Sequence, residues 1–163
     1  MSLTTKAVAP VQEAAGSGIL AQTLWIVAFA VATAAGARLE IPHEPVPYTL
    51  QTFVVLLSGA FLGSRNGAVS QLLYLTAGVL GAPVFAGGAF GFARLLGPSG
   101  GYLLAFPAAA ALVGYLIRDR RSILVTALAM AAGFLFFIWW DLLKLSAATA
   151  IYHELAKRWP RLP

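Results

Sequence analysis

The chain has 163 residues, of which 60% are hydrophobic and only 10% charged, and its mean hydropathy is +0.81. This composition excludes an ordinary soluble domain and favours a membrane protein, while the absence of cysteine excludes disulfides and thiolate chemistry. The net charge of +5 comes from basic residues scattered between apolar runs, which is typical of the positive-inside bias of membrane proteins rather than of nucleic-acid binding.

The first apolar run, Ile19–Ala37, carries no charge over 19 residues and follows a polar to mixed segment, residues 1–18. That segment is long and weakly charged, and the run exceeds the roughly 7–15 residues of a signal-peptide core, so a retained span is favoured over a cleaved signal. We expect residues 1–18 to be cytoplasmic, residues 19–158 to form a single transmembrane domain, and residues 159–163 to be a cytoplasmic tail.

Five further apolar runs predict the other helices of a six-helix transmembrane bundle. No strand-like alternation persists, so the expected fold class is an all-α integral membrane protein and not a barrel. The second run follows Pro47, which suits the first turn of a helix. After the first, the expected spans are Tyr48–Leu62, Ala68–Leu80, Gly101–Ile117, Ile123–Trp140 and Asp141–Leu155.

The second and third runs are shorter than the roughly 20 residues of a full span, which predicts a hollow at one membrane face. The segment that follows, Gly81–Gly97, is apolar, yet five of its 17 residues are glycine. Its backbone would be unsatisfied in lipid, so it must lie against protein or at the interface. We expect it to be a glycine-rich lid over the hollow, between helices 3 and 4.

The basic residues indicate how the bundle is oriented. If six helices alternate across the membrane, most basic residues fall on one side, which the positive-inside bias identifies as the cytoplasm. Both termini then lie in the cytoplasm, and the hollow and lid face outward. The residues on the cytoplasmic side are Lys6, Arg65, Arg118, Arg120, Arg121, Lys157, Arg158 and Arg161.

The junction between the fifth and sixth runs lacks a turn. Ile123–Leu155 would be roughly 50 Å long as one helix, at 1.5 Å per residue, far more than a bilayer core. A tight helical hairpin needs roughly 2–5 loop residues, which Trp139–Asp141 does not offer. Either the helix continues out of the membrane, or a connector near residues 139–141 is missing or shortened. In the second case at least one distance between consecutive Cα atoms there should clearly exceed the usual value of about 3.8 Å.

Asp141 and Lys144 are the sharpest candidates for ligand binding. They lie three residues apart in a run that is otherwise apolar or small, and hence on one helical face. Ionisable residues inside a membrane are functional by default, and an acceptor beside a cation could hold the two poles of a small ligand. The structural alternative is an intrahelical ion pair, or two anchors whose heads reach the interface.

Further candidates lie in the expected lid and around the second helix. Arg94, the only charge in the lid, either reaches to the interface or contacts a ligand carboxylate. Thr49 and Gln51 either cap and join helices or face the ligand. Three aromatic residues either pack the bundle or stack on the ligand, namely Tyr74, Phe85 and Tyr102.

The sequence does not support a catalytic or metal site. His43 is one of two histidines and has no partner at metal-ligand spacing. Motifs for nucleotide hydrolysis, zinc proteolysis and serine hydrolysis are absent. With one intramembrane carboxylate there is no carboxylate pair. We therefore expect no catalytic residue, no metal and no cofactor.

The first helix carries small residues at helical spacing. Ala28, Ala32 and Gly36 share one face at four-residue intervals. Such faces let backbones approach closely. They serve either packing within the bundle or docking to another membrane protein.

Four blocks of the sequence carry a resemblance to a known family. In order, IPHEPVPYTLQTFVVLLSGAFLG, GAVSQLLYLTAGVLGAPVFAGG, LLGPSGGYLLAFPAAA and DLLK resemble the BioY family, over about Ile19 to Arg158. Together the blocks are hard to match by chance. BioY proteins are the biotin-binding substrate (S) components of energy-coupling-factor (ECF) vitamin transporters.

The resemblance implies a six-helix bundle in the bacterial inner membrane that binds biotin with high affinity near its outer face. It implies three partners, a transmembrane coupling subunit and two ATPase subunits, with docking through small residues of helix one, here Ala28 and Ala32. It also implies an aspartate and a lysine of the last helix at the ligand, matching Asp141 and Lys144. Biotin has a carboxylate at one end and ureido N–H groups at the other, so its site needs a cation and an acceptor beside an apolar wall. Which pole meets which end stays open.

The sequence departs from the family where Trp140 directly precedes Asp141. Family members carry a longer connecting loop and helix start there, at the same junction that lacks a turn. The alternatives to a biotin subunit are an S component for another small vitamin, and an intramembrane enzyme acting on a lipid. Tight biotin binding without turnover would separate the three.

Overall fold

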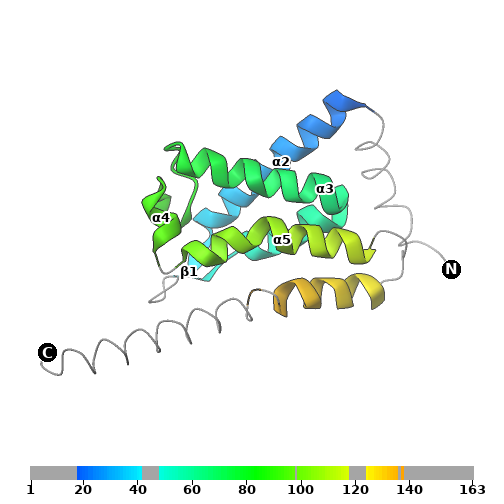
Figure 1. Cartoon of the computed structure of the whole chain (residues 1–163). Helices are drawn as coiled ribbons and strands as arrows, with labels where there is room; N and C mark the ends of the chain where they lie inside the picture. The colour runs from blue at the N-terminus through cyan, green and yellow to red at the C-terminus, as the bar shows by residue number, and fades with distance from the viewer. Residues whose placement is uncertain (1–17, 42–47, 98, 118–123, 136, 138–163) are drawn as a thin grey trace, which may run out of the picture.

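The computed structural model describes residues 18–41, 48–97, 99–117, 124–135 and 137. Its main helices are α2 (Ile19–Arg38), α3 (Gln51–Val79) and α5 (Gly100–Ile117), and Figure 1 shows a further helix, Leu124–Leu135, beside α5. The predicted first and fourth spans agree with α2 and α5 to within one residue at each end. α2 contains no proline, and its single glycine lies near its end, so nothing interrupts the helix.

The second and third predicted spans form one element, α3, which folds back on itself at Gly63. Gly63 has φ 79° and ψ 178°, a conformation that glycine adopts without steric cost. The arms on either side, residues 51–62 and 64–79, run antiparallel, since Gln51 at the start of one bonds to Tyr74 near the end of the other. Each arm is shorter than the roughly 20 residues of a full span, so the prediction of two short helices is confirmed.

The predicted boundaries of these two helices are wrong. α3 begins at Gln51 rather than directly after Pro47, and the residues between the two predicted spans are helical except at Gly63. The reason at the start is a short hairpin. Strand β2 (Tyr48–Thr49) pairs antiparallel with β1 (Glu40–Ile41), which satisfies backbone groups there without a helix. The purely helical expectation misses this hairpin.

The glycine-rich segment, Gly81–Gly97, contains the short helices η1 (Ala86–Gly88) and α4 (Ala93–Leu96). It returns to the end of α3, where the Gly91 N–H donates to the Gly78 carbonyl at 2.8 Å. The Phe85 ring is fully buried against Gly78 and leaves no room for a Cβ on that glycine. The segment therefore lies against the protein, as its irregular backbone requires.

The core forms where α3 and α5 cross at close range. A Cβ on Gly59 would collide with the Ala110 backbone, and one on Gly114 would collide with the Ser64 backbone. Small residues allow such contact between membrane helices. The largest buried apolar side chains around this crossing are Val55, Tyr74, Phe85, Phe106 and Val113.

A polar cluster is buried where α2 meets the two arms of α3. Its centre is Gln71, whose Nε2 donates to Ser58 Oγ at 3.0 Å and whose Oε1 accepts from Thr33 Oγ1 at 3.3 Å. All three side chains are completely inaccessible. Because buried polar groups must be paired, this cluster fixes how the three helical segments approach each other.

The outer surface indicates a bilayer. By length and composition α2, α3 and α5 each qualify as a candidate span, although the folded-back α3 qualifies only when its two arms are counted as one helix. Large apolar side chains such as Leu24, Val31 and Leu104 are more than half exposed, which suits lipid rather than water. The described residues thus form a helical membrane protein. The sixth predicted span and the junction at 139–141 lie outside them.

Candidate ligand-binding site

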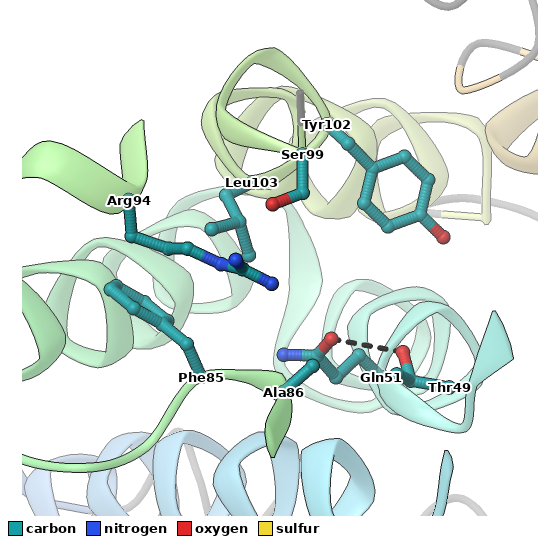
Figure 2. A pocket seen from close by; sticks show the side chains of 8 residues that line it. All are labelled: Thr49, Gln51, Phe85, Ala86, Arg94, Ser99, Tyr102 and Leu103. Carbon is teal, nitrogen blue, oxygen red and sulfur yellow. Dashed lines mark hydrogen bonds between the residues drawn. The ribbon is translucent and has the colours of Figure 1, made fainter. Parts of the chain in front are cut away.

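A pocket opens where the β1–β2 hairpin, the start of α3, the glycine-rich segment and the start of α5 meet (Figure 2). Its empty volume is about 300 Å³, part of it open to solvent. Because that volume includes open solvent, the pocket is a partly open recess rather than an enclosed cavity. The lining residues are Thr49, Gln51, Phe85, Ala86, Arg94, Ser99, Tyr102 and Leu103.

A chain of hydrogen bonds forms one side of the pocket. Thr49 Oγ1 donates to Gln51 Oε1 at 2.9 Å, Gln51 Nε2 donates to the Tyr74 hydroxyl, and that hydroxyl donates to the Val84 carbonyl at 3.2 Å. Gln51 is only 3% exposed. Its amide is therefore held in one orientation by partners on β2 and the second arm of α3.

Tyr74 takes part in this chain of hydrogen bonds but does not itself line the pocket. Its ring is 1% exposed and packs edge-on against Phe85, with centroids 5.6 Å apart, and in parallel against Phe106 at 6.1 Å. Its hydroxyl is bonded to protein on both sides. The geometry favours a packing and positioning role for Tyr74 over direct stacking on a ligand.

An aromatic wall closes the other side. Tyr102 on α5 lines the pocket, and its hydroxyl bonds to Thr52 Oγ1. Its ring packs edge-on against Phe106 at 5.4 Å and is tilted against Phe137 at 4.9 Å. Because these contacts hold the ring in place, Tyr102 offers a rigid apolar surface to a ligand.

Arg94 is the charged residue among the lining side chains. It lies on α4 and is half-buried, and its guanidinium points into the space between Leu103 and Gln51 (Figure 2). Ser99 directs its hydroxyl toward the same space from the start of α5. A guanidinium fork beside a hydroxyl, within apolar walls, suits a ligand that carries a carboxylate on an apolar body.

The pocket brings together five of the eight candidate residues named from the sequence, namely Thr49, Gln51, Phe85, Arg94 and Tyr102. Tyr74 lies directly behind them. Asp141 and Lys144 lie outside the described residues, so their predicted role stays a prediction.

The candidates predicted from the sequence did not include three of the lining residues, Ala86, Ser99 and Leu103. Ser99 and Leu103 lie in the stretch GPSGGYLL, in which the glycines and proline signalled only a turn into the next helix. A small polar residue directly before the apolar run was the available signal.

The two ends of the small-residue face of α2 differ in their exposure. Gly36 is buried against the backbone of Leu50 and Gln51, so this end of the face packs within the chain. Ala28 is exposed and Ala32 is half-buried. The outward part of the face is therefore the part that remains for docking.

The fold and the pocket together define a class: a helical membrane protein with a partly apolar pocket between helix ends and an irregular segment. The chain belongs to the BioY family, whose family model matches residues 7–135. That match ends before Asp141 and Lys144.

Named relatives and a solved structure agree with this assignment. The chain is 35% identical to the biotin transporter BioY of Thermotoga maritima over 148 residues, which covers 75% of this chain and 88% of the relative. It is 46% identical over 89 residues to a BioY protein of Pyrococcus horikoshii, with 55% of each chain covered.

The crystal structure of an S-component for biotin from an ECF-type ABC transporter superposes with a TM-score of 0.72 and 26% identity. The superposition covers 81% of this chain and 75% of that one. The chain spans about half the length of several curated relatives that it matches.

Proposed function

We propose that this chain is the high-affinity biotin-binding S component of an ECF-type vitamin transporter and captures biotin at the outer face of a bacterial inner membrane. The observation that carries the proposal is the similarity to the solved S-component for biotin over 81% of the chain, joined to the pocket around Arg94. The protein binds and does not convert its ligand, and biotin needs no cofactor to bind.

The pocket supplies the two kinds of surface that biotin requires. Arg94 offers a cation with paired donors for the carboxylate, and Phe85 and Tyr102 offer apolar surface for the body of the ligand. Asp141 and Lys144, on the last helix, supply a carboxylate and a second cation for the polar ends of the ligand. We place Arg94 at the carboxylate, because a planar guanidinium matches a carboxylate in two parallel hydrogen bonds.

The complete protein is a six-helix bundle in which the glycine-rich segment is the lid of the site. Two buried anchors support that role: the Tyr74 hydroxyl bonded to the Val84 carbonyl, and the Phe85 ring seated on Gly78. Both termini lie in the cytoplasm and the lid faces outward. Because the chain has no cysteine, a single Leu96→Cys should react with an impermeant thiol reagent in intact cells, and Ser2→Cys should not.

The connector between the fifth and sixth helices is shortened or missing in this sequence. The alignment with the Thermotoga protein runs over 148 residues but takes up 75% of the 163-residue chain, about 122 residues. About 26 aligned positions thus have no counterpart here. Gathered at this junction, that many residues would hold a loop and the first turns of a helix, which is the connector that the proposal requires.

The partners are a transmembrane coupling subunit and two ATPase subunits. The structural neighbour is a component of an ECF-type ABC transporter, which supports this assignment. Ala28 and Ala32 on the outward part of the α2 face are the docking residues, since small side chains permit close backbone contact in a membrane.

Equilibrium titration of the purified chain tests the ligand. Biotin should bind tightly, whereas lipoate, which shares the carboxylated chain but lacks the ureido group, should bind far more weakly. Tight binding of a different vitamin in place of biotin would assign the chain to another S component. Turnover of a lipid without biotin binding would make it an enzyme.

A further inference from the structure

Two side chains of opposite charge hold the glycine-rich segment from outside it. Arg38, the last residue of α2, donates from Nη2 to the Pro83 carbonyl at 2.6 Å. Glu40, in strand β1, accepts at Oε2 from the Gly87 N–H at 3.0 Å. One contact is to a backbone carbonyl and the other to a backbone amide. Both therefore depend on the backbone conformation of the segment and not on its side chains.

The residues between these two points include a wall of the pocket. Phe85 and Ala86 lie between Pro83 and Gly87 in the sequence, and both line the pocket. On the inner side the same stretch is tied to Tyr74 through the Val84 carbonyl. Three side chains from elsewhere thus hold five consecutive residues, two from the exposed side and one from the buried side.

The glycines at this corner fit the arrangement. Gly87 and Gly88 have φ of +67° and +73°, which side-chain-bearing residues rarely adopt. A Cβ on Gly88 would lie 3.0 Å from Nη1 of Arg38. The double glycine therefore gives the backbone its turn and leaves space for the arginine that holds it.

We propose that Arg38 and Glu40 form a two-point clasp that keeps the glycine-rich segment closed over the pocket and thereby sets how fast a bound ligand leaves. Neither residue touches the pocket, so both act as positioning residues through Phe85 and Ala86. The proposal rests on the proposed function only in that the ligand is biotin.

The exposure of both contacts suits a clasp that opens. Hydrogen bonds to charged groups are stronger than neutral ones, but solvent competes for them and their net contribution at an exposed position is small. The buried anchor at Tyr74 keeps the inner end of the segment in register while the outer contacts break and reform. Opening then exposes the pocket without unfolding the core.

Biotin dissociation from the purified full-length chain tests the clasp. Glu40→Ala and Arg38→Gln should each speed dissociation by roughly three- to tenfold, as loss of one exposed charge-assisted hydrogen bond allows, with little change in association. Glu40→Gln keeps an acceptor and should have a smaller effect. The matched control is Arg65→Gln, which removes an exposed arginine near the fold-back of α3.

A second measurement needs no ligand. Hydrogen exchange at the Gly87 amide should be faster in Glu40→Ala than in the parent and in Arg65→Gln, with unchanged unfolding temperature. Parent-like dissociation and exchange in the folded Glu40 and Arg38 variants would overturn the clasp. A parent that binds no biotin would refute the proposed function instead, and the Gly87 exchange rate would still decide whether the clasp exists.

Discussion

Arg94 is the lining residue with a full charge, and its guanidinium points into the pocket (Figure 2). If it binds the ligand carboxylate, Arg94→Gln should weaken biotin binding by about 10- to 100-fold, because hydrogen bonds to charged groups contribute roughly 1.5–3 kcal/mol. Biotin methyl ester, which has no carboxylate charge, should lose much less. Equal losses for the acid and the ester, measured by titration, would move the carboxylate elsewhere.

Asp141 and Lys144 are the two charged residues that the last helix contributes to the proposed site. Asp141→Asn and Lys144→Ala should each cost roughly 2–5 kcal/mol of binding energy, as is typical when one partner of a desolvated charged contact is removed. The unfolding temperature serves as the control for folding. Folded variants with parent-like affinity would return both residues to the structural alternative, an ion pair within one helix.

At the scale of elements, Gln71 joins α2 to both arms of α3 through Thr33 and Ser58. Gln71→Ala leaves buried hydroxyls without their partner and should destabilise the protein by roughly 1–3 kcal/mol. Thermal unfolding in detergent measures the change, and Gln22→Ala on the half-exposed start of α2 is the matched control. An unchanged unfolding temperature for Gln71→Ala would mean that the cluster does not hold these helices together.

The outward face of α2 carries the prediction about docking. Ala32→Trp should leave biotin binding intact but reduce co-purification with the coupling subunit, because a bulky side chain prevents close backbone approach. Ala108→Trp, at an exposed position on α5, is the matched control. Intact co-purification of the Ala32 variant alongside the control would reject this face as the docking site.

Hydrophobic runs predicted the helices well where the apolar run and the helix have the same ends. α2 and α5 were placed to within one residue at each end because each is a single uninterrupted apolar run. The start of α3 was misplaced because pairing between β1 and β2 is a contact between distant residues that local pattern does not reveal. The two predicted spans left residues 63–67 between them, but the confinement of the reversal to Gly63 was not predicted.

For the candidate site too, local features of the sequence were predictable and contacts between distant residues were not. Arg94 was found because a lone charge in an apolar segment is conspicuous in any sequence. No local pattern in the sequence singles out the clasp residues Arg38 and Glu40, since their partners are backbone atoms more than forty residues away. Tyr74 was predicted at the ligand, yet its two hydrogen bonds and full burial became visible only in three dimensions.

In the molecule as a whole, the described residues form a membrane protein in which a short-helix hairpin, α3, leaves space at one end and a glycine-rich segment borders this space. Each feature has a local cause: the reversal at Gly63, the buried Phe85 ring on Gly78, and the close crossing of α3 and α5 at Gly59. Together they place the pocket where helix ends, rather than helix faces, meet.

The central claim is that this chain captures biotin and releases it unchanged. The most direct measurement is to purify the chain after growth with biotin, denature it, and identify and count the released small molecules by mass spectrometry. One intact biotin should be released per chain from the parent and from Arg65→Gln, and less from Arg94→Gln, whose affinity should be about 10- to 100-fold lower. Purified, folded chain that carries no biotin and takes none up from solution, or that releases a chemically altered product, would contradict this claim.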